Sequence, residues 1–290
     1  MATEYNCYEM VKQIRIALND YSEEKVQGVD QTGPFLNEYI LDKINIAQRY
    51  IHSFIMTRDP SIFFKSTTIS GVNSTYTLPA NFGVLYEFRD DSGYEVFNMR
   101  PNQKKLDDST GSDRFYQRVG NTLVLDKDSV TDTYTLYYYT RPRNLDFGCC
   151  VSGSATEIQL ATDYAPKTAD YYNDMKIENV TQDWVDTIDD YTVNRVCTIS
   201  ETAVTNDYYG IVSELPEPFH FLIPMRAILD IKATHPNSQM PVSNPEMMMF
   251  NDQITETMRI YAGTSRDIPV DEIFVDLEPS IGGRGYVQYD

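Results

Sequence analysis

Residues 34–85 read PFLNEYILDKINIAQRYIHSFIMTRDPSIFFKSTTISGVNSTYTLPANFGVL, and this stretch decides the fold. Its first half repeats apolar residues every three or four positions, which is the period of a helix with one buried face. The apolar stripe consists of Leu36, Ile40, Ile44, Ala47, Ile51, Phe54 and Ile55, widened by Phe35, Tyr39, Ile46 and Tyr50. The rest of the helical wheel carries the polar residues Asn37, Asp42, Lys43, Asn45, Arg49 and Ser53. The pattern predicts an amphipathic helix over residues 35–58 that begins after Gly33-Pro34 and ends at Asp59-Pro60.

The second half of the stretch has the period of β-strands. Phe63, Lys65, Thr67 and Ile69 occupy every second position, and Ser70-Gly71 then predicts a turn. A long amphipathic helix that leads directly into short strands and turns is typical of an α+β fold.

The helix and the strands carry two sequence motifs. NEYI and INIAQRYI lie at residues 37–40 and 44–51, and residues 76–82 contain the pattern Tyr-x-Leu-Pro-x-x-Phe. This order resembles the head–tail adaptor (connector) proteins of bacteriophages, whose relatives in short-tailed phages are called tail accessory or tail tubular proteins. The resemblance implies a structural protein of the virion neck, made in the host cytoplasm, that forms a homo-oligomeric ring of about twelve copies. It also implies that the ring docks on the portal protein, contacts tail or nozzle proteins, and extends the DNA ejection channel toward the tail.

Length and charge limit the possible functions. The 290 residues can form one large domain or two ordinary ones, at roughly 150 residues per domain. The 43 acidic residues outnumber the 24 basic ones and give a formal net charge of −19. This charge argues against wrapping nucleic acid, because that requires Lys and Arg to displace counterions. It fits either ordinary solubility or a ring that double-stranded DNA passes without specific binding.

The four cysteines are Cys7, Cys149, Cys150 and Cys197. Their spacing matches neither CxxC nor a secreted disulfide framework, so we expect reduced thiols. The first residues lack the pattern of a secretory signal peptide, and no apolar run approaches the ~18 residues of a membrane span. We therefore expect synthesis in a cytosol and no membrane contact.

The periodic segments predict four parts of the chain. These are a discontinuous helical domain at 1–60 and 215–262, a β-sandwich domain at 61–149, an inserted β-module at 150–214 and an extended C-terminal arm at 263–290. Within them we expect a first helix over 4–20, a polar loop over 21–34, and hairpins around residues 90–93 and Gly120-Asn121. The helices at 35–58 and 217–262 should pack together, because each apolar stripe needs a partner.

Residues 170–211 carry a second set of motifs: DYYNDMKI (170–177), IDDY (188–191), VCTI (196–199) and YYGI (208–211). The set resembles a small β-sandwich module that is widespread in phage virion proteins and is often inserted into neck and tail components. The usual form has Gly where this chain has Asp174, and a Gly-rich hairpin where this chain has residues 181–184. We expect that residues 150–213 can be deleted, because the segments on either side should form their own core.

Helix signals return after residue 215. Pro224 should kink a helix or lie in its first turn, and Ser243-Asn244-Pro245-Glu246 forms a good helix start. Three consecutive methionines follow at 247–249; a helix core accounts for Met247 but not for all three, so a helix core and an adaptable interface both stay open there. Residues 264–290 have no helical period, and we expect them to become ordered only against a partner. The candidate residues of an oligomer or portal interface are Ile268, Val270, Ile273, Phe274, Val275, Leu277, Met248 and Met249.

Residues for catalysis or metal binding lack the required spacing. His52, His220 and His235 have no ligand partners at metal-site spacing, so we expect surface or capping histidines, with His52 on the polar side of its helix. The pairs Asp107-Asp108 and Asp189-Asp190 are weak candidates for glycoside hydrolysis, which needs two acids about 5–10 Å apart. No nucleophile, P-loop or dinucleotide motif occurs. We expect no enzymatic activity, no cofactor and no metal.

One alternative function stays open from the sequence. It is a carbohydrate-binding or tail-fibre-attachment β-sandwich protein on the virion exterior. Tyr171, Tyr172 and Trp184 would then form its aromatic platform.

Overall fold

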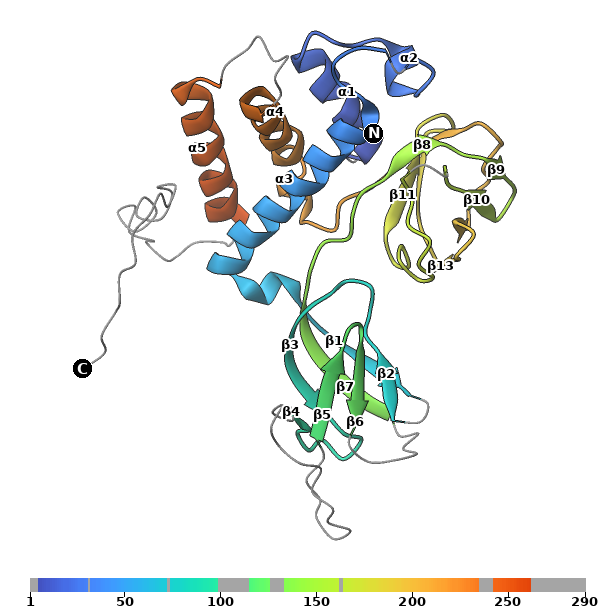
Figure 1. Cartoon of the computed structure of the whole chain (residues 1–290), viewed down its shortest axis with the longest axis vertical. Helices are drawn as coiled ribbons and strands as arrows, with labels where there is room; N and C mark the ends of the chain where they lie inside the picture. The colour runs from blue at the N-terminus through green and yellow to red at the C-terminus, as the bar shows by residue number, and fades with distance from the viewer. Residues whose placement is uncertain are drawn as a thin grey trace, which may run out of the picture.

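The computed structural model describes residues 5–30, 32–71, 74–98, 115–125, 133–161, 164–234 and 242–261. Figure 1 shows a helical unit, a β-unit of strands β8 to β15 beside it, and a second β-unit of strands β1 to β7 below. The chain therefore has a mixed α+β fold, as the sequence predicts. The predicted arm at 263–290, His235 and Asp107-Asp108 lie outside the described residues.

The helical unit combines both ends of the chain. Its helices are α1 (Cys7–Ala17), α2 (Glu23–Val26), α3 (Asn37–Arg58), α4 (Leu222–Thr234) and α5 (Asn244–Tyr261), with the short 3-10 turns η1 (Pro60–Phe63) and η2 (Glu217–Phe219). α3 packs against α4, as the two apolar stripes require, and α1 packs against both. Pro224 lies in the first turn of α4, where a missing N–H costs nothing. The predicted polar loop at 21–34 contains α2, whose N-cap Ser22 accepts a hydrogen bond from the backbone of Lys25.

The central helix α3 confirms the predicted helix to within two residues, but its buried surface differs from the predicted stripe. Ile40, Ile44, Ala47, Ile51 and Ile55 are fully buried, whereas Leu36 lies outside the helix as an exposed N-cap.

The polar side of α3 is partly buried, which the helical wheel did not predict. Asn45 donates to Leu145 O (3.3 Å), and Gln48 donates to Arg143 O (2.7 Å). Asn37 accepts from the buried guanidinium of Arg15 (2.7 Å). These side chains replace water for the backbone carbonyl groups and the guanidinium that pack on α3, so their burial is compensated.

The β1–β7 unit has two sheets. One has the order β1-β7-β3, with β1 (Phe64–Ser70), β7 (Thr133–Thr140) and β3 (Phe82–Arg89); the other has the order β2-β6-β5-β4, with β2 (Thr75–Thr77), β6 (Thr122–Leu125), β5 (Phe115–Val119) and β4 (Phe97–Asn98). The hairpin at Gly120-Asn121 is confirmed by the antiparallel pair β5–β6. The expected hairpin around residues 90–93 is shorter than predicted, since only Arg89 bridges to Glu95 and β4 pairs in parallel with β5.

The β8–β15 unit also has two sheets. One has the order β12-β11-β15-β8, and the other β13-β14-β10-β9. The strands are β8 (Phe147–Cys149), β9 (Ser152–Gly153), β10 (Glu157–Gln159), β11 (Lys176–Asn179), β12 (Trp184–Thr187), β13 (Asp190–Tyr191), β14 (Val196–Thr198) and β15 (Tyr208–Ile211). Because β8 pairs with β15, this sheet begins before residue 150, from which the sequence predicts the inserted module.

The two positions at which the sequence departs from the module that it resembles fall at turns with special backbone geometry. Asp174 has a φ of 65° and Asp183 a φ of 57°, both in the left-handed region that favours Gly and that Asp tolerates. In the β11–β12 hairpin the side chain of Asn179 accepts hydrogen bonds from the backbone N–H groups of Thr181 and Gln182, both at 3.0 Å. Side-chain hydrogen bonds thus stabilise the turn that glycines otherwise allow.

The buried residues form two separate cores. One cluster joins the helical unit to the β8–β15 unit, and the other lies wholly inside the β1–β7 unit. At the joint, the ring of Tyr8 contacts those of Phe147 (6.4 Å between centroids) and Tyr208 (5.8 Å), and Asn6 bridges to Val212. The expectation that residues 150–213 can be deleted therefore loses its physical basis, because the flanking helices share their core with that segment.

Arg143, between β7 and β8, is bound to the β8–β15 unit and to Glu214 by a network of partly buried polar contacts. Its guanidinium donates to Glu214 Oε1 (2.8 Å) and to the carbonyl oxygens of Tyr171 (2.9 Å) and Asn173 (2.7 Å). Its own backbone N–H donates to Glu214 Oε2 (2.9 Å).

We expect Arg143→Met to lower the free energy of unfolding by about 3–5 kcal/mol, because it removes the guanidinium from Glu214 and from two carbonyl groups and leaves Glu214 only the backbone N–H of residue 143. Urea titration measures the change. Arg259→Met is the matched control, since Arg259 pairs with Glu256 at the exposed surface, and its loss should leave the free energy of unfolding nearly unchanged. Equal effects of the two substitutions would contradict a special role for Arg143.

Candidate assembly interface

α5 exposes the two methionines that the sequence singles out. Its buried stripe consists of Phe250, Ile254 and Met258, so Met248 and Met249 project elsewhere and are 64% and 50% exposed. α5 packs against α4 and η2 and lies at the edge of the helical unit (Figure 1). Ile260 and Tyr261 at its end are exposed as well. We call Met248 and Met249 the α5 surface.

The start of α5 is held by a capping box. Ser243 N–H donates to Glu246 Oε2 (2.9 Å), and Glu246 N–H donates to Ser243 Oγ (3.4 Å). Lys232 of α4 donates to Glu246 Oε1 (2.7 Å), and this hydrogen bond, with those from Ser243, lowers the pKa of Glu246 to about 2. α5 is thus fixed to α4 by an ionised carboxylate at neutral pH, and the methionines next to it are presented on a defined helix.

The outer face of the β1-β7-β3 sheet is a second apolar surface, which the sequence did not reveal. Phe64, Val84, Tyr86, Tyr137 and Tyr139 form it, and we call it the aromatic face. Val84 is 60% and Tyr86 62% exposed. In the register of the sheet, Tyr139 pairs with both Phe64 and Val84, so these three side chains are neighbours.

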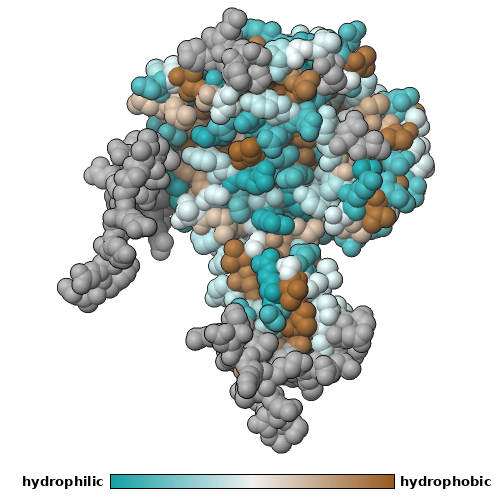
Figure 2. Space-filling model, viewed as in Figure 1, coloured by the Kyte–Doolittle hydropathy of each residue, from teal (hydrophilic) through white to brown (hydrophobic). Residues whose placement is uncertain are grey.

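The rings of the aromatic face contact one another. The ring centroids of Phe64 and Tyr86 are 5.4 Å apart, those of Phe64 and Tyr139 are 5.5 Å apart, and those of Tyr86 and Tyr139 are 6.0 Å apart. Figure 2 shows hydrophobic residues at the surface of the β1–β7 unit. A contiguous exposed apolar patch marks an interaction site. The signal for the aromatic face in the sequence lies in β7. A strand with one buried face normally has polar residues at its outward positions, but β7 has Tyr137 and Tyr139 there.

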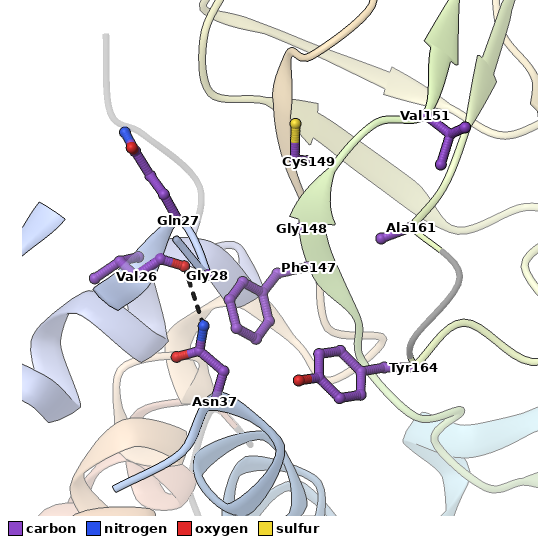
Figure 3. A pocket seen from close by; sticks show the side chains of 10 residues that line it. All are labelled: Val26, Gln27, Gly28, Asn37, Phe147, Gly148, Cys149, Val151, Ala161 and Tyr164. Carbon is purple, nitrogen blue, oxygen red and sulfur yellow. Dashed lines mark hydrogen bonds between the residues drawn. The ribbon is translucent and has the colours of Figure 1, made fainter. Parts of the chain in front are cut away.

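A groove lies where the helical unit meets the β8–β15 unit. It encloses about 330 Å³ and is lined by Val26, Gln27, Gly28, Asn37, Phe147, Gly148, Cys149, Val151, Ala161 and Tyr164. Figure 3 shows the end of α2 on one side and strand β8 on the other. Burial raises the pKa of the Cys149 thiol, so this cysteine is protonated at neutral pH.

The histidines that the structure describes are structural. His52 is half-buried rather than on a polar surface, and its Nε2 lies 2.9 Å from Thr140 O. Burial lowers the pKa of His52. His220 is buried, with Nε2 2.6 Å from Leu215 O. The described part of the chain contains no group of three His, Cys, Asp or Glu side chains that could hold a metal ion.

The proposed carbohydrate platform does not form on the surface. Tyr172 is buried against Tyr191, with ring centroids 4.9 Å apart, and Tyr171 packs on Tyr172 at 5.0 Å. Trp184 is half-buried in β12, where its indole N–H donates to Thr202 O (3.0 Å). Aspartates 189 and 190 are exposed.

The other candidate interface residues are not described by the structure. They are Ile268, Val270, Ile273, Phe274, Val275 and Leu277. Among the described helices, none is long and apolar enough to cross a membrane.

Comparison with known proteins gives one family. The model of the family described as SU10 adaptor protein matches residues 5–149, half of the chain, from before α1 to the end of β8. No curated protein matches the chain.

Proposed function

This chain belongs to the SU10 adaptor protein family of phage structural proteins, and on that premise we propose that it forms a homo-oligomeric ring in the neck of the virion. One end of the ring docks on the portal protein, and the other meets tail or nozzle proteins. The ring extends the DNA channel toward the tail. Synthesis in the host cytoplasm precedes its assembly.

The observation that carries this proposal is the pair of exposed apolar surfaces. The α5 surface and the aromatic face belong to different units and have different residues. A cyclic ring needs two different complementary patches on each subunit, because every copy contacts its neighbours head to tail. Apolar surfaces of this kind are unfavourable in a free monomer and favourable in an assembly.

The charge of the chain suits a channel. With 43 acidic and 24 basic residues, the protein has few cations with which to displace the counterions of DNA. Double-stranded DNA therefore passes the ring without specific binding.

We expect the double variant Met248→Ser, Met249→Ser to fold normally and to lose ring assembly, alone or on portal rings. Both side chains are exposed, so their removal leaves the core intact. Electron microscopy of the purified protein with and without portal measures assembly, and thermal melting measures folding. Asp252→Ser, another exposed position of α5, is the matched control and should assemble as the unchanged protein does. If the unchanged protein forms no ring on its own or with portal, the proposed function is wrong.

A further inference from the structure

The β1–β7 unit is one continuous segment of the chain, so the chain enters it once and leaves it once. Strand β1 begins at Phe64, and β7 ends at Thr140. Figure 1 shows the two crossings, one from η1 into β1 and the other from the end of β7 toward β8. Phe63 and Leu145 lie in the core of the helical and β8–β15 units, whereas Tyr138 lies in the core of the β1–β7 unit. Among the described residues, no buried apolar side chain belongs to both cores, and units without a common core move relative to each other unless their connections prevent it.

The first crossing passes from one unit to the other at a single residue, Phe64. Its backbone N–H still donates to Ser61 O of η1, while in β1 the same residue already pairs with Tyr139. Phe63, one position earlier, is buried in the other core. The φ and ψ angles of Phe64 are therefore the place where the direction of the chain can change without breaking either unit.

The second crossing is equally short. Arg141 N–H donates to Asn81 O (2.8 Å) at the start of β3, which fixes Arg141 to the β1–β7 unit. Arg143 is fixed on the other side, since its backbone N–H and its guanidinium both donate to Glu214. Only Pro142 separates the two fixed residues.

We propose that the β1–β7 unit rotates as one rigid body about an axis through Phe64 and Pro142, and that it carries the aromatic face with it. Two pivots of one residue each define a single axis of rotation. Residues at the ends of elements are the usual hinges between domains, because a few φ and ψ angles there absorb the whole change. The ring of Pro142 fixes its own φ and so limits the range of the rotation.

His52 of α3 keeps the two crossings together. Its ring centroid lies 4.3 Å from that of Phe63, and its Nε2 lies 2.9 Å from Thr140 O. Both contacts lie beside the axis, where a rotation displaces atoms least. His52 therefore holds the pivots in place without fixing the angle between the units.

The rotation changes the direction of the aromatic face relative to the α5 surface. It is a property of the free subunit and does not depend on the ring. In a ring, it lets the aromatic face of each subunit meet its partner at more than one angle.

Distances between two spin labels measure the angle in the full-length protein. Cys149 is replaced by Ser, and the remaining native cysteines are buried and do not react: Cys7, Cys150 and Cys197. Labels at Asp42→Cys and Thr68→Cys connect α3 with β1, where residue 68 is exposed and lies roughly 13 Å from the pivot at Phe64. Labels at Asp42→Cys and Glu157→Cys, also exposed, stay within the units that share a core and form the control pair.

Double electron–electron resonance gives the distance distribution of each pair, in samples diluted with unlabelled protein so that only labels of one chain are measured. We expect the distribution of the pair at 42 and 68 to be about twice as wide as that of the control pair, or wider. Equal widths would show that the units form one rigid body and would overturn the proposal, while the proposed ring would be unaffected.

Pro142→Gly tests the position of the axis. Gly frees the φ angle that Pro fixes, so the distribution of the pair at 42 and 68 should widen further while that of the control pair stays the same. Pro166→Gly, between β10 and β11, is the matched control and should change neither distribution. A merely structural role of Pro142 would lower the melting temperature without widening one pair selectively. If Pro142→Gly does not fold, Pro142→Ala takes its place, and an unchanged distribution in the folded variant would contradict a pivot at Pro142.

Discussion

Ile44→Asp and Ile51→Asp are each expected to unfold the protein or leave it insoluble. Both side chains are fully buried on α3, in the cluster that joins the helical unit to the β8–β15 unit. A carboxylate there has no partner, and its burial costs at least ~4 kcal/mol, a large part of the stability of an ordinary domain.

Ile46→Asp is the matched control for this prediction. Ile46 lies on the same helix and is 38% exposed, so the same substitution should change the free energy of unfolding by less than about 1 kcal/mol. Circular dichroism during urea titration measures both. A soluble Ile44→Asp protein that melts like the control would show that this face of α3 does not lie in a core.

The second large effect concerns which part of the chain can be removed. Replacing residues 64–139 by a short Gly-Ser linker should leave a folded protein. The β1–β7 unit has its own core, and Phe64 and Tyr139 are opposite each other in adjacent strands, so the two ends to be joined are close. The remaining chain keeps the shared core of the helical and β8–β15 units.

Deleting residues 150–213 should have the opposite result. The deletion removes from the shared core the buried residues Ile158, Leu160, Tyr172, Ile177, Ile188, Tyr191, Cys197, Ile199, Tyr209 and Ile211. α1 packs on β15, so the deletion uncovers the apolar side of α1, and each large side chain that loses its packing there costs about 2–5 kcal/mol of a typical domain stability of about 5–15 kcal/mol. The helical unit should then lose its cooperative melting transition.

Both deletions are compared by circular dichroism, thermal melting and limited proteolysis. If the protein without 150–213 melts cooperatively and the one without 64–139 does not, the assignment of the two cores is wrong.

Several elements were determined by the sequence alone, because their signals are local. The repeat of apolar residues and the flanking Gly33-Pro34 and Asp59-Pro60 predicted α3 to within two residues. The capping residues at 243–246 predicted the start of α5, and Gly120-Asn121 predicted the β5–β6 hairpin. The exposure of Met248 and Met249 also followed from the stripe, since the core side of one helix cannot hold three consecutive residues.

Only the tertiary structure decided how these elements combine. The helical pattern did not place Gln48 in a core. In the structure its side chain donates a hydrogen bond to Arg143 O, 95 residues away, and accepts one from Ser213 Oγ, 165 residues away. β8 joined the sheet of the inserted segment, and Tyr8 packed on it, so the segment that appeared separable by its motifs shares a core with the helices. The aromatic face arose because three strands from separate stretches placed Phe64, Tyr86 and Tyr139 side by side. Periodicity reports which face of one element is apolar, whereas burial depends on which distant element covers that face, and no local pattern contains that information.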